Sequence, residues 1–287
     1  MEVYTRHDIC DALKKAGLKK GDIALVSTEL YHLGRLEGVK TREEYYRAFL
    51  DAFMEVLGGE GTLAVNAYTT QTGRYGTPFH REKTPATTGA FSQYIASHPG
   101  SIRSIHPINS VAAIGTKKKL ICENVSRSNY GLDSPFDRML RMGVQIVRLG
   151  LDYAHNVYMH YAEAMYGVPY YYHKLLDIEV YDQGKLIEGE FFAAVRHLEY
   201  PLIDDFSKIK RVIVDKKLVH SAKLGGDYVH CIDAQEYLAA ATELLKKDPY
   251  AFLAQRPDFV KGVKPFDGIT AGRDGIEKAG NYKFTNK

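Results

Sequence analysis

The sequence GDIALVSTEL, at residues 21–30, passes from an apolar run into a polar turn. Ile23–Val26 is typical of a buried strand, and Ser27–Leu30 of the turn that follows a strand's carboxyl end. The same arrangement returns at Thr62–Val65, which leads into the polar Tyr68–Thr70. Two buried strands with polar carboxyl ends, separated by a helical pattern, predict an open α/β sheet whose ligands bind at those ends.

Capping residues mark the helices around these strands. Thr5 with Asp8 opens the first helix, and Thr41 with Glu44 opens the second. The same signals predict helices at 6–16, 41–57, 89–97, 134–142, from near Val157 onward and at 234–246, and further buried strands at 110–114 and 144–149. Residues 71–87 show no periodicity and predict a long surface loop, a feature that is often functional in compact domains.

The pattern changes after Tyr172. Short alternating runs predict antiparallel strands at Asp177–Tyr181, Phe191–Val195, Arg211–Val214 and Leu218–Ser221. We therefore expect a single domain over residues 1–287 with a three-layer α/β fold. It would consist of an open mixed sheet with helices on both faces, plus an antiparallel C-terminal portion at about 173–230. The tail at 256–287 has weak periodicity and receives no assignment.

The composition is that of an ordinary globular protein. The chain has 287 residues, of which 45% are hydrophobic and 25% charged. Its lysines and arginines are scattered and the net charge is only +3, so we expect no nucleic-acid partner.

No apolar run reaches the ~20 residues of a membrane span. The first 20 residues lack the apolar centre of a signal peptide, and the three cysteines form no C-x-x-C pair. These features predict a reducing, cytoplasmic setting without disulfides or structural zinc.

His160 and Glu163 are the first candidates for chemistry. A spacing of three places them on one face of the helix that begins near Val157. A carboxylate beside an imidazole selects its tautomer and stabilises its protonated form, which makes the histidine a better general base. Such pairs are also common on solvated helices. This one, however, follows the strand at 144–149, at the end where α/β enzymes bind their ligands.

Several segments, taken in order, resemble the aminoglycoside 3-N-acetyltransferase family. The most specific stretch lies between Pro99 and Glu163, and it resembles the family signature R-S-x-H-P-x-x-S-x-A-A-x-G at Arg103-Ser104, His106-Pro107, Ser110, Ala112-Ala113 and Gly115. The other matching segments are Val26–Leu30 with Leu33-Gly34, Gly61–Leu63 with Tyr68-Thr69, Asp133–Phe136, Leu149-Gly150, His160–Glu163, Asp204–Phe206, and Asp248-Pro249 with Phe252-Leu253. The resemblance runs from about Gly21 to Leu253.

This resemblance implies the family's α/β fold, acetyl-CoA as co-substrate, a primary amine of an amino sugar as acceptor, and no metal. His160 would be the general base and Glu163 its support. The candidates for binding coenzyme A are Ser27, Thr28, Arg103, Ser104, His106 and Ser110, and those for binding the acceptor are Thr69, Asp152, Tyr153 and Asn156. A structural turn at His106 and a simple strand start at Ser110 remain alternatives. The sequence is compatible with a homodimer and does not determine the oligomeric state.

Two positions depart from the family pattern. The first turn reads Ser27-Thr28-Glu29 where the family usually has His-Ser-Ser. Ala154 stands where an Asp is usual, with Asp152 or His155 as substitutes. Aminoglycosides are polycations that favour an acidic pocket, whereas this chain is slightly basic and carries a tyrosine cluster between residues 158 and 172. That cluster suits a polar ring-shaped ligand or simply fills the core. We therefore expect a less cationic acceptor, such as a nucleotide-linked amino sugar.

Three other functions remain open from the residues alone. A thioesterase or other hydrolase would use the same His160–Glu163 pair with water as acceptor. A metal-dependent enzyme would use His155, His160 and Glu163, but their spacings of five and three differ from the i, i+4 histidines of a metalloprotease helix. A non-catalytic homologue would keep the fold and bind ligand without turnover.

Overall fold

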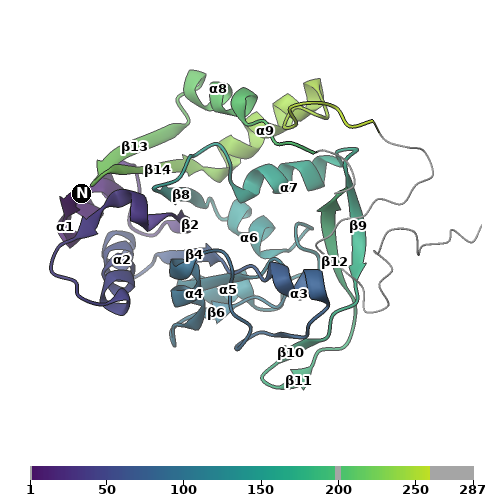
Figure 1. Cartoon of the computed structure of the whole chain (residues 1–287), viewed down its shortest axis with the longest axis horizontal. Helices are drawn as coiled ribbons and strands as arrows, with labels where there is room; N and C mark the ends of the chain where they lie inside the picture. The colour runs from purple at the N-terminus through teal and green to yellow at the C-terminus, as the bar shows by residue number, and fades with distance from the viewer. Residues whose placement is uncertain (1, 198–201, 259–287) are drawn as a thin grey trace, which may run out of the picture.

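The computed structural model describes residues 2–197 and 202–258. Its centre is a seven-stranded mixed sheet in the order β13-β14-β8-β2-β4-β7-β6 (Figure 1). These strands are β2 (Ile23–Thr28), β4 (Thr62–Asn66), β6 (Ile102–Arg103), β7 (Val111–Gly115), β8 (Gln145–Leu149), β13 (Val219–Leu224) and β14 (Asp227–Asp233). β2 pairs in parallel with β4 and with β8, and the outer strands add antiparallel pairs on both sides.

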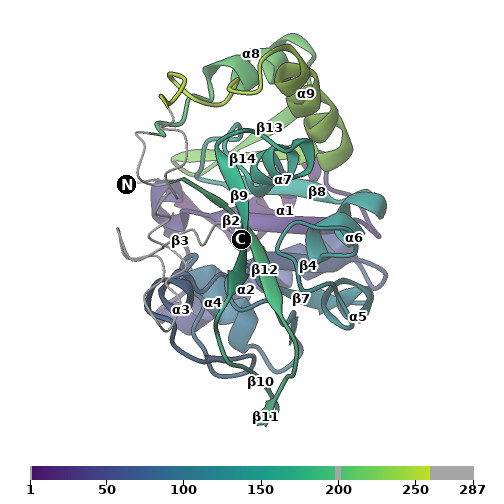
Figure 2. The ribbon, with the colours of Figure 1, turned by 90° about the vertical axis from the view of Figure 1, so that its right-hand side faces the viewer.

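Alternate residues of β2 face two different layers of helices. Ile23 and Leu25 pack in one core, and Ala24 and Val26 pack in the other. The first core contains residues of α5 (Lys118–Cys122), α6 (Pro135–Arg141), α7 (Val157–Tyr166), α8 (Ser207–Asp215) and α9 (Ala234–Lys247); the second contains residues of α1 (Arg6–Lys15), α2 (Arg42–Leu57) and α4 (Ala90–Ser97). Figure 2 shows α5 and α6 on one side of the strands and α4 on the other. The predicted three-layer mixed sheet is therefore confirmed.

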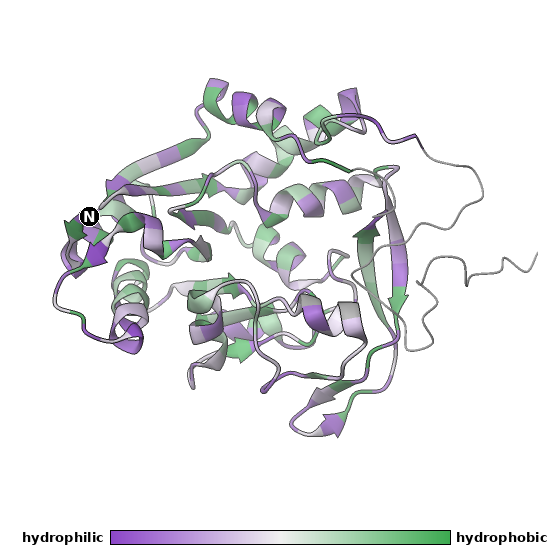
Figure 3. Ribbon diagram, viewed as in Figure 1, coloured by the Kyte–Doolittle hydropathy of each residue, from purple (hydrophilic) through white to green (hydrophobic). Residues whose placement is uncertain are grey.

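Three smaller sheets accompany the main one within the described residues. β9 (Tyr171–Leu176) pairs antiparallel with β12 (Phe191–Arg196), and both stand next to α7 in Figure 1. A three-stranded sheet joins β5 (Phe79–His80), β10 (Val180–Asp182) and β11 (Lys185–Leu186). Hydrophobic residues follow the inner strands and α2 in Figure 3, whereas the β11 end of the molecule is hydrophilic. The first residues contribute β1 (Val3–Tyr4), which pairs in parallel with β3 (Arg35–Leu36) after the 3-10 turn η1 (Leu30–Leu33).

The helix caps predicted from the sequence are present. Thr5 and Asp8 form a capping box on α1, and Thr41 and Glu44 form one on α2. Asp233 accepts hydrogen bonds from the first backbone N–H groups of α9. Each such cap contributes about 1 kcal/mol to helix stability, so these helix ends are encoded locally.

Four predictions about elements were wrong or incomplete. Residues 71–87 are not one loop, because α3 (Thr70–Tyr75) and β5 lie within or across them. Residues 211–214 belong to helix α8 rather than to a strand. Ile209 and Ile213 are both fully buried, and their i, i+4 spacing is helical. The predicted polar turn after Val26 begins later, since β2 continues through Thr28. β9, β14 and α5 and the two-residue strands β1, β3, β6 and β11 were not predicted from the sequence. Of the unassigned tail, residues 259–287 lie outside the described residues.

Candidate active site

Helix α7 presents His160 and Glu163 at the carboxyl end of β8. Asn156 caps the helix by accepting a hydrogen bond from Tyr158 N at 2.9 Å. The loop at 150–156 joins β8 to α7, and Gly150, at φ +64°, begins it; a Cβ atom there would clash with the backbone of Glu29. The His160 side chain is 26% exposed and that of Glu163 is 0% exposed. The imidazole therefore reaches solvent while its carboxylate partner is sealed beneath it.

Hydrogen bonds from four side chains converge on the Glu163 carboxylate. Nδ1 of His160 lies 2.9 Å from Oε2, and the hydroxyls of Tyr170 and Tyr171 donate to Oε1 and Oε2 at 2.7 Å each. Arg196, on β12, donates from Nη2 to Oε1 at 3.0 Å and from Nη1 to Asp204 Oδ1 at 2.5 Å. The carboxylate is thus held in one orientation by groups from α7, the start of β9 and the end of β12.

These contacts keep Glu163 ionised. Burial by itself raises the pKa of the Glu163 carboxyl, but the hydrogen bond and charge of His160 and the charge of Arg196 outweigh it and lower the pKa to about 2. An ionised carboxylate only accepts hydrogen bonds. Nδ1 of His160 must therefore carry the proton that faces Glu163, which leaves Nε2 as the basic nitrogen of the neutral ring.

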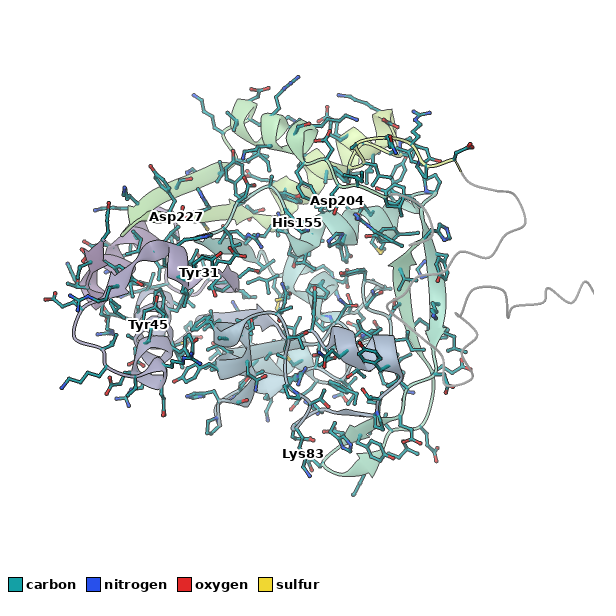
Figure 4. All side chains as sticks on the ribbon, in the orientation of Figure 1. Tyr31, Tyr45, Lys83, His155, Asp204 and Asp227 are labelled. Atoms are coloured by element: carbon teal, nitrogen blue, oxygen red, sulfur yellow. The ribbon has the colours of Figure 1, made fainter. Side chains whose placement is uncertain are left out.

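His155 lies beside that basic nitrogen. Its Nε2 atom is 3.4 Å from Nε2 of His160, and its ring stacks on Phe206 with the centroids 4.5 Å apart. Figure 4 labels His155 close to Asp204 above α7. Loss of hydration, together with the charges of His160 and Arg148, lowers the pKa of His155 to about 4. The neutral His155 can then donate its Nε2–H to the free lone pair of His160.

A cavity of about 270 Å³ opens over His160. Its walls include Ser27 at the end of β2, Arg148 on β8, Asn66 at the end of β4 and Tyr68 just after it, together with His155 and Asn156. A second cavity of about 480 Å³ is lined by Thr28, Tyr45 and Gly89 among others. Thr28 and Gly89 each directly follow a residue that lines the first cavity, Ser27 and Thr88. Ser27 and Thr28, predicted together as cofactor ligands, face opposite sides of the sheet because side chains alternate along a strand. They consequently line different cavities.

Five residues predicted to bind ligand have hydrogen-bond partners within the protein. Arg103 is 6% exposed and donates to Ser110 Oγ at 2.9 Å, to Ala67 O at 2.6 Å, and to Thr84 O. Ser104 and Ser110 are fully buried, with Ser110 Oγ donating to Ala67 O at 2.6 Å and Ser104 Oγ accepting from Val111 N at 2.9 Å. Thr69, 1% exposed, donates to Pro107 O. This network ties the chain after β4 to the segment between β6 and β7.

His106 belongs to the same buried network. Its Nδ1 accepts from the backbone N–H groups of Ile108 and Asn109, and its Nε2 donates to Phe192 O at 2.9 Å. Burial lowers the pKa of His106 to about 4, so the ring is neutral. Both ring nitrogens are used, which matches the structural turn that the sequence left open as an alternative. None of these signature residues is among those lining the cavity over His160 in the described part of the chain.

The remaining acceptor candidates lie around the β8–α7 loop. Asn156 lines the cavity over His160, whereas Asp152 is exposed and pairs with Lys210 Nζ at 2.5 Å. The Lys210 ammonium also sits 5.3 Å from the centre of the Tyr153 ring. Asp152 therefore does not supply an uncompensated charge to the cavity, although Ala154 N donates to its Oδ1 at 2.8 Å and so shapes the loop.

Sequence reasoning missed Arg196 and Arg148 and gave no individual role to Tyr170 or Tyr171. Tyr170 and Tyr171 were noted only as members of a cluster, and the structure places both hydroxyls on Glu163. A repeated Tyr-Tyr beside a buried acid is a signal that could have been used. Arg196 carries no such signal, because it comes from a strand 33 residues further along the chain.

Within residues 2–197 and 202–258, no three His, Cys, Asp or Glu side chains are grouped so that they could hold a metal ion. In the same part of the chain, no helix has the length and apolar character needed to cross a membrane. Cys10, Cys122 and Cys231 are all buried and free.

Comparison with known proteins identifies relatives of this chain. The family model for aminoglycoside 3-N-acetyltransferase matches residues 25–246. Aminoglycoside N(3)-acetyltransferase III of Acinetobacter baumannii is 28% identical over 183 residues, and the alignment covers 58% of this chain and 63% of that protein. The chain therefore spans less than two thirds of the length of this relative. Aminoglycoside N(3)-acetyltransferase IV of a Salmonella species is 23% identical, with 87% and 90% covered.

Solved structures show the same fold. The apoenzyme of aminoglycoside acetyltransferase AAC(3)-IVa superimposes with a TM-score of 0.72 at 24% identity, covering 88% of this chain and 92% of that chain. AAC-IIIb in a binary complex with CoASH gives a TM-score of 0.72 at 20% identity, covering 89% and 100%. These similarities confirm the predicted fold class.

Proposed function

Because the chain belongs to the aminoglycoside 3-N-acetyltransferase family, we propose that it transfers an acetyl group from acetyl-CoA to a primary amine of an amino sugar. The observation that carries this proposal is the orientation of His160. Its Nδ1 is committed to the buried Glu163 carboxylate, and its Nε2 lies at a cavity that a substrate can enter. AAC-IIIb, whose fold this chain shares, has been solved with CoASH, which supports a thioester co-substrate.

The geometry supports general-base catalysis by His160. A protonated amine has no lone pair with which to attack a thioester, so the acceptor first loses one proton to solvent and reacts as the neutral amine. His160 Nε2 would take a proton from the amine as its nitrogen bonds to the acetyl carbon, and would return a proton to the departing thiolate sulfur as the carbon–sulfur bond breaks. The imidazolium formed between these steps is stabilised by the Glu163 carboxylate 2.9 Å away. The acid form of Glu163 would be a poor partner, and the contacts with His160 and Arg196, which lower the pKa of this carboxyl, disfavour it.

The two cavities offer places for two substrates. We assign the smaller cavity over His160 to the acceptor amine and the acetyl group, and the larger one beside Thr28 to the arm of the co-substrate. Ser27 lines the smaller cavity and can donate a hydrogen bond to the oxyanion that forms on the acetyl oxygen. The guanidinium of Arg103 is engaged within the protein, and we do not assign it to a phosphate.

The test is thiol release from acetyl-CoA by the purified chain, followed with a disulfide reagent, with and without a panel of amino sugars. Amine-dependent release, with the N-acetyl product seen by mass spectrometry, supports the proposal. Thiol release at a rate that does not depend on added amine would instead support a thioesterase. Binding of acetyl-CoA without release from any acceptor would support a non-catalytic homologue.

A further inference from the structure

Arg148 occupies the same cavity as the proposed base. In the main sheet its register partners are Ser27 on β2 and His230 on β14, so the three side chains lie side by side on one face. That face is the one covered by α7, and Arg148 lines the cavity together with His155 and His160. A cationic group thus projects into the space where an acceptor amine must sit.

Among residues 2–197 and 202–258, the two terminal nitrogens of the Arg148 guanidinium have no hydrogen-bond partner. Nε donates to Asp152 O at 3.0 Å, and among the described residues no carboxylate forms an ion pair with this arginine. The nearby Asp152 carboxylate is taken by Lys210 at 2.5 Å. By contrast, Arg81, Arg138 and Arg196 each hold a carboxylate within 3.0 Å. Burial lowers the pKa of Arg148, and the charges of Asp152, Tyr237 and Glu29 offset only part of that effect.

The rest of the cavity contributes no negative charge. Apart from Arg148 and the two histidines, its walls are neutral and include Ser27, Asn66, Tyr68, Thr88 and Asn156. Glu163 does carry a charge nearby, but it lies buried behind His160 and is neutralised by Arg196. A polycationic acceptor would bring its additional ammonium groups toward Arg148, which repels them, without meeting a free carboxylate of the cavity wall.

Asn66 contributes a second polar group that lacks a hydrogen-bond partner among the described residues. Its side-chain Oδ1 is buried and, within the described residues, accepts no hydrogen bond, although its backbone oxygen is bound by Thr88. A buried acceptor without a donor is unfavourable unless a ligand or water completes it. The cavity therefore offers an open fork of donors at Arg148 and an open acceptor at Asn66.

We propose that the acceptor is an amine that also carries an anionic group, a carboxylate or a phosphate, and that Arg148 binds this group while Asn66 accepts from a hydroxyl or amine of the same molecule. This rests on the proposed function, which it deepens by naming the acceptor class. An arginine fork binds either anion through two parallel hydrogen bonds. The phosphates of coenzyme A are poor candidates for this site. Its pantetheine arm is about as long as four amino-acid residues, so an extended arm places them roughly 14 Å from a thioester at His160.

Acetyl transfer and binding should be measured with a graded set of amino sugars. Glucosamine, which carries no anionic group, is the reference. Muramic acid adds a carboxylate, glucosamine 6-phosphate adds a phosphate, and gentamicin is the polycation. We expect kcat/KM for one of the anionic acceptors to exceed that for glucosamine and gentamicin by roughly 10- to 100-fold, the effect of one charged hydrogen-bonded pair. The acceptor with the higher value tells whether the anion is a carboxylate or a phosphate.

Arg148→Gln should abolish this preference by lowering kcat/KM for the anionic acceptor roughly 10- to 100-fold while the KM for acetyl-CoA stays unchanged. Arg148→Lys keeps the charge without the fork and should restore part of the loss. Arg141→Gln, on α6 and outside this cavity, is the matched control. A preference for gentamicin, an equal loss for all acceptors, or a rise confined to the KM for acetyl-CoA would overturn the proposal.

A binding experiment distinguishes a failure of this inference from a failure of the proposed function. If the wild-type chain acetylates no amine, the proposed activity fails, but calorimetry can still compare the binding of glucosamine 6-phosphate, muramic acid and glucosamine. Tighter binding of an anionic ligand that is lost in Arg148→Gln would sustain the anion site. Equal binding of all three would reject it.

Discussion

The Nη2 atom of Arg196 lies 3.0 Å from Oε1 of Glu163, so that a β12 residue 33 positions away joins His160 in keeping the carboxylate beneath the proposed base ionised. The same arginine reaches Asp204 with its other terminal nitrogen. This bridge joins α7, β12 and the segment before α8. The bridge holds these segments together and also favours the charged form of Glu163, and both effects can be measured.

Glu163→Gln should reduce the free energy of unfolding by about 3 kcal/mol, because it removes one charge of a buried pair and leaves Arg196 partly uncompensated. Urea denaturation measures this loss. Asp204→Asn is the control. Asp204 is 31% exposed against 0% for Glu163, and we expect its substitution to cost about 1 kcal/mol. Equal costs for the two variants would mean that burial does not strengthen the Glu163 pair.

The wild-type chain should lose stability in acid through Glu163. Its pKa is lowered from 4.5 to about 2, so its contribution is fully present above pH 4.5 and is lost as the pH falls from 4.5 toward 2. The loss over that window is roughly 3 kcal/mol. Unfolding curves at several pH values, compared with those of Glu163→Gln, isolate it. If the variant shows the same acid dependence below pH 4.5, Glu163 is not the group responsible.

His106 should produce a second, earlier loss. Burial lowers its pKa from 6.5 to about 4, so the unfolded chain binds a proton below pH 6.5 that the folded chain refuses. Stability therefore falls as the pH drops from 6.5 toward 4, by about 2 kcal/mol at pH 5. In His106→Gln the difference in free energy of unfolding between pH 8 and pH 5 should shrink by that amount. An unchanged difference would assign the effect to other histidines such as His155, whose pKa is lowered as well.

His160→Gln should lower kcat by roughly 10²- to 10⁴-fold at neutral pH, the usual contribution of a general base. The KM for acetyl-CoA should change little. Thiol release in the presence of the best acceptor measures both constants, and circular dichroism checks that the variant is folded. His7→Gln is the matched control because its side chain is 80% exposed on α1. A kcat that survives in His160→Gln would exclude this residue as the base.

Local patterns in the sequence predicted most of the main sheet and its helices. The Thr5–Asp8 and Thr41–Glu44 boxes, the apolar runs of β2, β4 and β8, and the cap at Asp233 depend on residues only a few positions apart. The wrong predictions fall where the conformation that the local sequence favours differs from the one that packing in the fold favours. Alternation at 211–214 suggested a strand, but burial of Ile209 and Ile213 against the first core makes this segment a helix.

By itself the sequence determined that His160 and Glu163 share a helix face and that this helix follows a strand, since both follow from spacing along the chain. It also determined the family signature from Arg103 to Gly115. Only the tertiary structure decided what these residues do. It turned Arg103, Ser104, His106 and Ser110 inward, brought Arg196 to Glu163, and placed Arg148 and His160 in the wall of one cavity. The reason is physical: a polar side chain acquires its charge state and its partners from groups that packing brings within about 3 Å, and those groups come from distant parts of the chain.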